Sequence, residues 1–369
     1  MSLRKNLSNL FGWKTKRKIV VIESDDWGSI RTKSTKAYQI MKEGGLELDR
    51  SNFTMYDTLE SNSDLESFFH VLKNHKDSTG RHPVFTPMCV VANPDFERIK
   101  KSNFEFYFYE SFTETCKKYP EHDRVHNLWL KGIQERLFVP QLHGREHLNA
   151  KRWIDALKEG NEGLLLAFDN QSFGATYYKG GVLPEHLAAF DPKAVSDIPA
   201  LHEVTIEAGK LFEQICGYKP KHFIASNSPE PKELERTLKE IGVEYLTRYK
   251  IQRYPLGDGR FEKQFNWLGK KNNLGQIYLT RNAIFEPSAF EIPNTLNECL
   301  ADLEIAFKWG KPAVISSHRV NYVGGIEKSN REKGLNMLDD LLRKIILKWP
   351  DIEFMTSEEL GSLIKNEGK

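Results

Sequence analysis

The sequence predicts an α/β fold with a mainly parallel sheet or barrel, and two observations lead to this prediction. Short runs of apolar and often β-branched residues, each bounded by polar residues, are typical of strands that are covered on both faces. Between these runs lie longer stretches in which apolar residues recur at the spacing of amphipathic helices. Because strand and helix patterns alternate along the chain, the strands are expected to run parallel to one another.

Each predicted element is a segment with one of these two patterns. The predicted strands are Lys18–Ser24, Val84–Val91, Leu137–Leu142, Leu164–Phe168, Phe223–Ser226, Tyr245–Arg248, Ile277–Arg281, Ala313–Ser317 and Glu353–Met355. The predicted helices are Leu65–Lys73, Ala150–Glu159, Ile198–Ile215, Pro231–Ile241, Leu296–Trp309 and Arg331–Lys348. Asn149 and Gly242 are end signals for two of these helices. Long segments at 93–138, 171–199 and 252–276 interrupt the alternation, and such segments are usually functional or structured on their own.

Size and composition are those of an ordinary globular protein. Of the 369 residues 39% are hydrophobic, and we expect a basic N-terminal segment, residues 1–17, followed by a single domain, residues 18–369. A net charge of +2 is too small to indicate a nucleic-acid partner. The four cysteines are too widely spaced for a disulfide framework. We recognise no secretory signal and no apolar run of roughly 20 residues that could span a bilayer, so a cytoplasmic protein is expected.

The N-terminal segment allows two interpretations. Six cations precede the first acidic residue, and four large apolar residues lie among them, namely Leu7, Leu10, Phe11 and Trp13. A short amphipathic helix of this composition could make a peripheral contact with a membrane surface. A solvated or packed segment is the simpler interpretation, because basic N-termini are common.

Two acidic residues, Asp25 and Asp26, end the first predicted strand. In parallel α/β folds, ligands and catalytic groups gather at the carboxyl ends of the strands. Two adjacent carboxylates repel each other unless a cation or a shared proton separates their roles. The pair therefore indicates either a functional site or an aspartate that caps the next helix.

Histidines at two further strand ends extend this candidate site. His143 and His147 follow the strand at 137–142, and four residues apart they would share one face of a helical turn and could bind one metal ion. Gly144 stands where metalloproteases of the HExxH type have glutamate, so that motif is absent. His318 ends a late strand and is a candidate general acid, because imidazole titrates near neutrality. Unrelated surface or core histidines are the structural alternatives.

In this order the motifs resemble the polysaccharide deacetylase family (NodB homology, carbohydrate esterase family 4). The resemblance implies an α/β fold of the NodB type, an irregular (β/α) barrel of about seven strands, here with long insertions. It implies that Asp25 is the catalytic base, that His318 is the acid, and that a divalent metal is bound by Asp26, His143 and His147. Zn²⁺ is the first expectation for the metal, with Co²⁺, Ni²⁺ or Mn²⁺ as alternatives. The implied substrate is an N-acetylated saccharide that loses its acetyl group by hydrolysis.

The sequence departs from the family pattern in two motifs and in the gap from Asp26 to His143, which is longer than expected because of the insertion between them. Its ESDDWG replaces the family's TFDDG and also resembles the ADDFG start of the YdjC-like carbohydrate deacetylases, a related barrel with an Asp/His/His metal site. The Arg-x-Pro motif that holds the base in the family has no arginine in the corresponding segment 223–229. The arginines near expected strand ends that could orient Asp25 instead are Arg145, Arg281 and Arg319. Trp27 could belong to a sugar-binding platform, although most aromatic residues of a barrel lie in its core.

Two other classes of function stay open at this point. A glycoside hydrolase on a related barrel would need two carboxylates about 5–10 Å apart across the sugar. Asp25 and Asp26 fit that requirement poorly, because neighbouring residues of a strand point to opposite faces. A degenerate barrel that binds glycans without turnover is the non-catalytic alternative.

Overall fold

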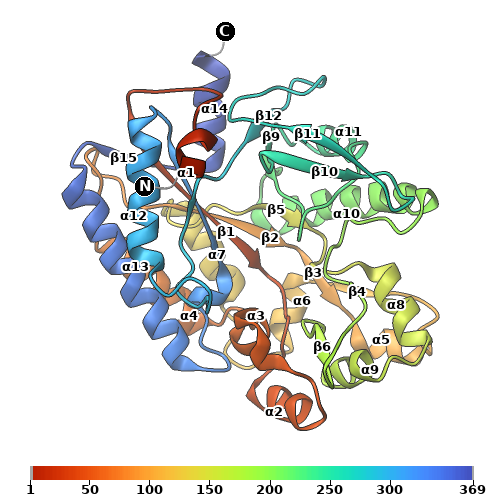
Figure 1. The fold of residues 1–369 in the computed structure, drawn as a ribbon. Helices are drawn as coiled ribbons and strands as arrows, with labels where there is room; N and C mark the ends of the chain where they lie inside the picture. The colour runs from red at the N-terminus through yellow and green to blue at the C-terminus, as the bar shows by residue number, and fades with distance from the viewer. Residues whose placement is uncertain (1–2, 368–369) are drawn as a thin grey trace.

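The structure, a computed structural model, describes residues 3–367 and has a curled parallel sheet at its centre (Figure 1). The strands lie in the order β12 (Ile277–Leu279), β9 (Tyr245–Thr247), β8 (His222–Phe223), β5 (Gln141–Gly144), β2 (Phe85–Val90), β1 (Lys18–Trp27), β14 (Ala313–His318) and β13 (Ala283–Ile284). β15 (Ile352–Met355) pairs with the first half of β1. Each pairing described within this sheet is parallel. The predicted α/β class is confirmed.

The sheet curls round on itself. β12 and β13 stand at opposite ends of the strand order, yet only three residues of chain, 280–282, separate them. The backbone N–H of Asn282 donates to the carbonyl of Val314 on β14. If β12 and β13 are counted as one strand of the barrel, the strand order contains seven strands. This is the number that the resemblance implies. The carboxyl ends of all these strands therefore face one common opening.

Amphipathic helices cover the outside of the sheet (Figure 1). Neighbours contact one another in the order α12 (Thr295–Lys308), α13 (Lys328–Lys348), α4 (Asn62–Lys73), α7 (Val125–Gln134), α10 (Ile198–Cys216) and α11 (Leu234–Glu240). α4 shows why these segments are helical. Ser61 and Asp64 form a capping box at its start, and Leu65, Phe68 and Leu72 are buried on its inner side.

Apolar side chains fill the barrel near the amino ends of the strands. Ile19 and Val21 of β1 cluster there with residues of other strands and of α14 (Ser357–Glu367), including Tyr245, Leu279, Val314, Met355 and Leu360. Val20 and Ile22 point the other way, into the cluster between the sheet and the outer helices. Because side chains alternate along a strand, Glu23 follows on the inner face. The interior of the barrel thus changes from apolar to polar toward the carboxyl end of β1.

All six predicted helices are present, and one predicted strand is wrong. The segment 164–168 lies in α9 (Glu162–Asp169), a helix capped by Asn161, whose side chain accepts a hydrogen bond from the backbone N–H of Leu164. A short apolar run fits a buried helix as well as a buried strand, so its pattern alone could not decide. Leu164 and Phe168 pack into a second hydrophobic cluster beside the barrel.

The long segments between the barrel strands form small elements of their own. The helices among them are α2 (Thr35–Glu43), α3 (Asn52–Tyr56), α5 (Phe96–Lys101), α6 (Phe112–Lys117) and α8 (Ala150–Lys158), and α1 (Leu3–Ser8) precedes the sheet. The added strand pairs are β3–β4 (Ala92–Pro94, Tyr109–Ser111), β6–β7 (Tyr177–Tyr178, Gly181–Val182) and β10–β11 (Ile251–Pro255, Phe261–Phe265). No helix in residues 3–367 combines the length and the apolar character that crossing a bilayer requires.

Candidate metal centre

A bulge at the end of β1 brings both aspartates to one cavity. The pairing with β2 is regular up to Ser24 and resumes at Trp27, and a single residue of β2 lies opposite Asp25 and Asp26. Asp26 has a left-handed backbone with a φ of 77°, a conformation that costs a residue with a side chain about 1–3 kcal/mol. The bulge interrupts the alternation of side chains, and both carboxylates line the cavity. The expectation that these neighbours point to opposite faces is therefore wrong.

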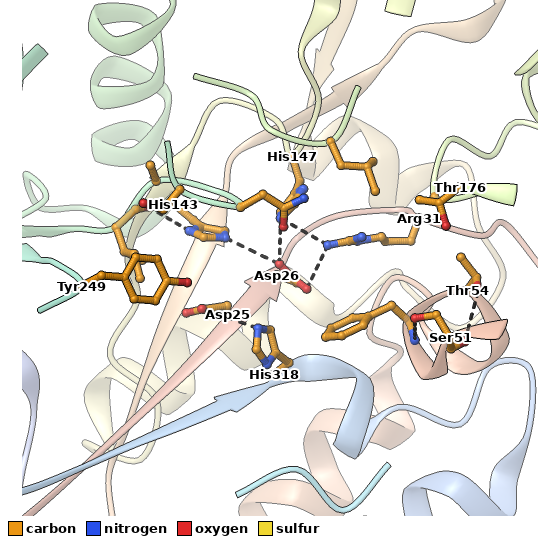
Figure 2. A pocket seen from close by; sticks show the side chains of 17 residues that line it. Asp25, Asp26, Arg31, Ser51, Thr54, His143, His147, Thr176, Tyr249 and His318 are labelled. Atoms are coloured by element: carbon orange, nitrogen blue, oxygen red, sulfur yellow. Dashed lines mark hydrogen bonds and ion pairs between the residues drawn. The ribbon is translucent and has the colours of Figure 1, made fainter. Parts of the chain in front are cut away.

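Asp26, His143 and His147 converge in this cavity (Figure 2). Oδ1 of Asp26 lies 3.5 Å from Nε2 of His143 and 3.2 Å from Nε2 of His147. Potential ligand atoms of the three side chains all lie within 4.8 Å of one another, and all three residues are buried. One carboxylate oxygen and two imidazole nitrogens form a common donor set for divalent transition metals. The three residues could therefore hold a metal ion.

The two histidines reach this point from a strand and a loop instead of a helix. His143 lies in β5, and Gly144 after it has a φ of 144°, which no helix contains. The next helix, α8, begins only at Ala150, so the predicted helical turn through His147 is wrong. Nδ1 of His143 donates to the carbonyl oxygen of Ile224 at 2.9 Å, and Nε2 is the nitrogen that faces Asp26.

The protonation states of this cluster suit a metal ligand set. Burial raises the pKa of the Asp26 carboxyl, but Arg31 and the two imidazoles outweigh it and hold this pKa well below its usual range. Burial and the nearby Arg31 lower the pKa of His147 to about 4. At neutral pH Asp26 is therefore an anion and His147 is a neutral imidazole, the forms that coordinate metals.

Arg31 is a residue of this site that sequence reasoning missed. It follows β1 on the turn toward α2, and its Nη2 donates to Oδ2 of Asp26 at 3.0 Å and lies 3.2 Å from Nε2 of His147 (Figure 2). Its Nε lies 3.6 Å from Oδ2 of the buried Asp57. Arg31 thus binds Oδ2 of Asp26, and Oδ1 faces the two imidazoles. A cation five residues after the acid pair was the only available signal in the sequence.

Arg281 holds the second aspartate of the pair. Its guanidinium donates to both carboxylate oxygens of Asp25, at 2.7 and 2.6 Å, and through Nε to Glu23 at 2.6 Å. Glu23 is fully buried and accepts a further hydrogen bond from Ser357. Burial raises the pKa of the Asp25 carboxyl, but Arg281, with His143 and His318, outweighs this effect and lowers the pKa overall. Asp25 is therefore an oriented anion at neutral pH.

His318 lies at the end of β14, next to Asp25 (Figure 2). Its Nε2 is 3.7 Å from Oδ2 of Asp25, and its Nδ1 is 2.6 Å from Oε1 of Glu286. The other oxygen of Glu286 accepts a hydrogen bond from the side chain of Asn321. Burial by itself lowers the pKa of His318, but Glu286 and Asp25 outweigh it and raise this pKa to about 9. His318 is consequently protonated at neutral pH.

The cavity that these groups share has a volume of about 220 Å³. Besides the charged groups, its wall includes Phe53, Thr176, Asn227, Ser228 and Tyr249. Tyr249 is 62% exposed, and in Figure 2 it lies near Asp25 and His143 at the edge of the site. The cavity therefore offers hydroxyl and amide groups beside the candidate metal ligands.

Three of the proposed binding or orienting residues lie elsewhere. Trp27 is 1% exposed and packs between the rings of Phe68 and Phe138, so it belongs to the core and not to a sugar platform. Arg145 pairs with Glu146 and Glu207. Arg319 is fully buried between Asp57 and Glu60, and Glu60 also accepts a hydrogen bond from the turn after β1. Arg281 alone among the three candidate arginines contacts Asp25 in the described structure.

No protein-family model and no curated protein matches this sequence. Among solved structures, a putative polysaccharide deacetylase from Mycobacterium smegmatis is similar over 97% of this chain and 94% of its own, with 10% identity and a TM-score of 0.44. An allantoinase is similar over 96% and 92%, with 9% identity and a TM-score of 0.47. For the 4-alpha-glucanotransferase from Thermococcus litoralis the identity is 11% and the TM-score 0.43, and the match covers 93% of this chain but only 40% of that enzyme.

Proposed function

We propose that this protein is a metal-dependent hydrolase that removes the acetyl group from the nitrogen of an N-acetylated sugar or polysaccharide. One observation carries the proposal. An Asp-His-His donor set, the carboxylate of Asp25 and the imidazole of His318 share one cavity, and the last two lie 3.7 Å apart. Hydrolysis of an unreactive amide uses an electrophile, a general base and a general acid, and these groups can supply all three.

The proposed metal ligands are Asp26, His143 and His147. A divalent metal, with Zn²⁺ as the first candidate, would supply polarisation of the amide carbonyl and a water of lowered pKa. Arg31 orients Asp26 by holding Oδ2, so that Oδ1 faces the imidazoles. This arrangement resembles the hydrogen bonds that fix ligating carboxylates in metal sites generally.

Asp25 and His318 divide the proton transfers between them. Asp25, which Arg281 keeps ionised, accepts the proton of the attacking water. His318, which Glu286 keeps protonated, donates its proton to the nitrogen as the carbon–nitrogen bond breaks, and the sugar leaves as a neutral amine. Acetate is the second product.

A glycoside hydrolase is less well supported by the same geometry. Such an enzyme needs one carboxyl group that is protonated and a second one across the sugar. Asp25 and Asp26 lie side by side at one strand end, and both have lowered pKa values. Each is also bound by an arginine, so neither is available as the acid of that reaction.

Metal content tests the donor set directly. Purified wild-type protein is expected to bind about one equivalent of divalent metal and to release acetate from an N-acetylated saccharide. His143→Ala and His147→Ala should weaken metal binding by more than the roughly 10–100-fold that loss of an outer hydrogen-bond partner costs. His70→Ala, at an exposed position of α4, is the matched control. Stoichiometric metal in both cavity variants would refute the ligand assignment, and a metal-loaded enzyme that releases no acetate from any N-acetylated saccharide would refute the substrate class.

The pH profile tests the acid. Because His318 must be protonated, kcat/KM is expected to stay high through neutrality and to fall as pH rises through about 9. Glu286→Gln removes the charge that raises the pKa of His318, so the alkaline limb should move to lower pH. Rates of acetate release measured at a series of pH values locate the alkaline limb of the wild type and that of the variant. An alkaline limb that does not move would exclude His318 as the acid.

A further inference from the structure

Exposed large apolar side chains concentrate in two segments of the chain. Seventeen are exposed among the described residues, and nine of them fall within 7–11 and 249–274, namely Leu7, Leu10, Phe11, Tyr249, Ile251, Leu256, Phe265, Trp267 and Leu274. The two segments meet in space, because the rings of Phe11 and Phe265 lie edge to face with centroids 6.0 Å apart. The ring of Trp267 lies next to that of Phe265, with the two centroids 5.9 Å apart. Phe11, Phe265 and Trp267 therefore form one continuous apolar surface.

The strand pair β10–β11 contributes a face that is both apolar and cationic. The register places three cross-strand pairs on it, Ile251 with Phe265, Arg253 with Lys263, and Pro255 with Phe261. The residues between them belong to the opposite face, where Gln252 and Tyr254 are buried and where Glu262 also lies. The outward face therefore carries two exposed apolar side chains, Ile251 and Phe265, together with two cations and no acidic residue, whereas Phe261 is half-buried and Pro255 is buried.

The cations on this surface lack acidic partners within it. Arg253 and Lys263 stand directly opposite each other, an arrangement that repels unless an anion neutralises it. The guanidinium of Arg253 lies over the ring of Phe261, 4.2 Å from its centroid, and the ammonium of Lys270 lies over Trp267 at 4.9 Å. Cations and aromatic rings are thus interleaved across the surface.

The apolar residues of the N-terminal segment are held in place by the folded body. The ammonium of the buried Lys311 donates to the carbonyl oxygens of Phe11, Gly12 and Trp13 at 2.7, 2.6 and 2.8 Å. The backbone N–H of Trp13 donates to the carbonyl of Leu268 at 2.8 Å. Phe11 is therefore presented to solvent at a fixed position beside β11, although 57% of it is exposed.

We propose that this surface, formed by Phe11, Ile251, Arg253, Lys263, Phe265 and Trp267, binds the surface of a membrane that contains anionic phospholipids. A membrane surface can bind both the apolar and the cationic side chains. The apolar side chains enter the region below the lipid headgroups, and the cations contact the phosphates. In a symmetric dimer formed through this surface, the cations of one copy would lie close to the cations of the other across the two-fold axis. A soluble polyanion would leave Ile251, Phe265 and Phe11 without a partner.

Vesicle sedimentation of the full-length protein tests this proposal. We expect binding to vesicles of phosphatidylcholine mixed with phosphatidylglycerol, much weaker binding to phosphatidylcholine alone, and release as salt is raised. The double variants Arg253→Glu/Lys263→Glu and Phe11→Ser/Phe265→Ser should each weaken binding to the mixed vesicles by about tenfold or more. Absence of binding to mixed vesicles at low salt would overturn the proposal, as would equal binding of the wild type and both variants.

Control variants elsewhere on the surface distinguish a specific loss of vesicle binding from a general effect of changing exposed residues. Leu347→Ser changes a leucine of α13 that is 67% exposed, and Lys101→Glu reverses a charge on α5, far from β10–β11 (Figure 1). Both should bind vesicles as the wild type does, and all four variants should keep the wild-type melting temperature. Sedimentation velocity adds a further criterion. A wild-type dimer that becomes monomeric with Phe11→Ser/Phe265→Ser would identify the surface as an interface between copies and would overturn the lipid assignment.

Discussion

Asp25→Asn is expected to slow acetate release by about 10²–10⁴-fold while the bound metal stays in place. Asparagine nearly preserves the shape of the side chain and can still accept a hydrogen bond from Arg281. It has no carboxylate to take the proton from water, so only the chemical step should suffer. Turnover and metal content measured on the same preparation separate this result from loss of the metal.

Two further variants make the assignment of Asp25 specific. Asp26→Asn should lower both turnover and metal content, because Asp26 is the carboxylate that faces His143 and His147. Asp351→Asn, at an exposed carboxylate that pairs with Lys18, should leave both unchanged. Turnover of Asp25→Asn close to that of the wild type would remove Asp25 from the role of base.

Arg281→Met is expected to lower the free energy of unfolding by about 3–5 kcal/mol. The substitution leaves Glu23, a fully buried carboxylate, without its counter-charge and also releases Asp25. Denaturant unfolding of the purified variant measures the loss. The double variant Glu23→Gln/Arg281→Met should recover part of it, because it no longer buries an unpaired charge. Arg260→Met removes a guanidinium with a largely exposed side chain and serves as the control, with an expected change within about 0.5 kcal/mol.

The stability difference caused by Arg281→Met should depend on pH. Burial raises the pKa values of Glu23 and Asp25, but Arg281 and the nearby histidines together outweigh it, and both pKa values are lowered. Carboxyl groups of lowered pKa stabilise the native state above their unfolded pKa values, and this stabilisation is lost as pH falls through the native values. The gap between the wild type and the variant should therefore narrow in acid. A gap that is constant from neutral to acidic pH would show that the two carboxylates are not the cause.

The elements of the barrel could be predicted because they follow from local pattern. The amphipathic run that became α13 carries a periodicity that only a helix satisfies, and the apolar run that became β1 is rich in the β-branched residues that favour strands. The segment 164–168 was mispredicted because five apolar residues have no such periodicity. The helical turn expected through His143 and His147 is absent for another reason, since the prediction rested on spacing and not on the backbone conformations that are open to Gly144.

The candidate site was predictable only in part. Asp25, Asp26 and His318 lie at strand ends, and a parallel sheet brings such positions together whatever the intervening loops are. Glu286 follows β13 in the same manner, but this strand has only two residues and was not predicted, so the rule could not be applied to Glu286. Arg31 could not be found either, because its contact with Asp26 depends on a turn whose backbone path no local pattern specifies.

The sequence by itself determined the alternation of strands and helices and the set of chemical groups at the strand ends, because both depend on residues close together in the chain. Only the tertiary structure decided which of three arginines meets Asp25, since Arg281 is 256 residues away from it and reaches it where the sheet curls round on itself. It also decided that Asp25 and Asp26 face one cavity, because the bulge that turns Asp26 inward arises from the pairing of β1 with β2. Contacts of this kind depend on how distant strands are placed against one another, and the order of residues along one strand does not encode them.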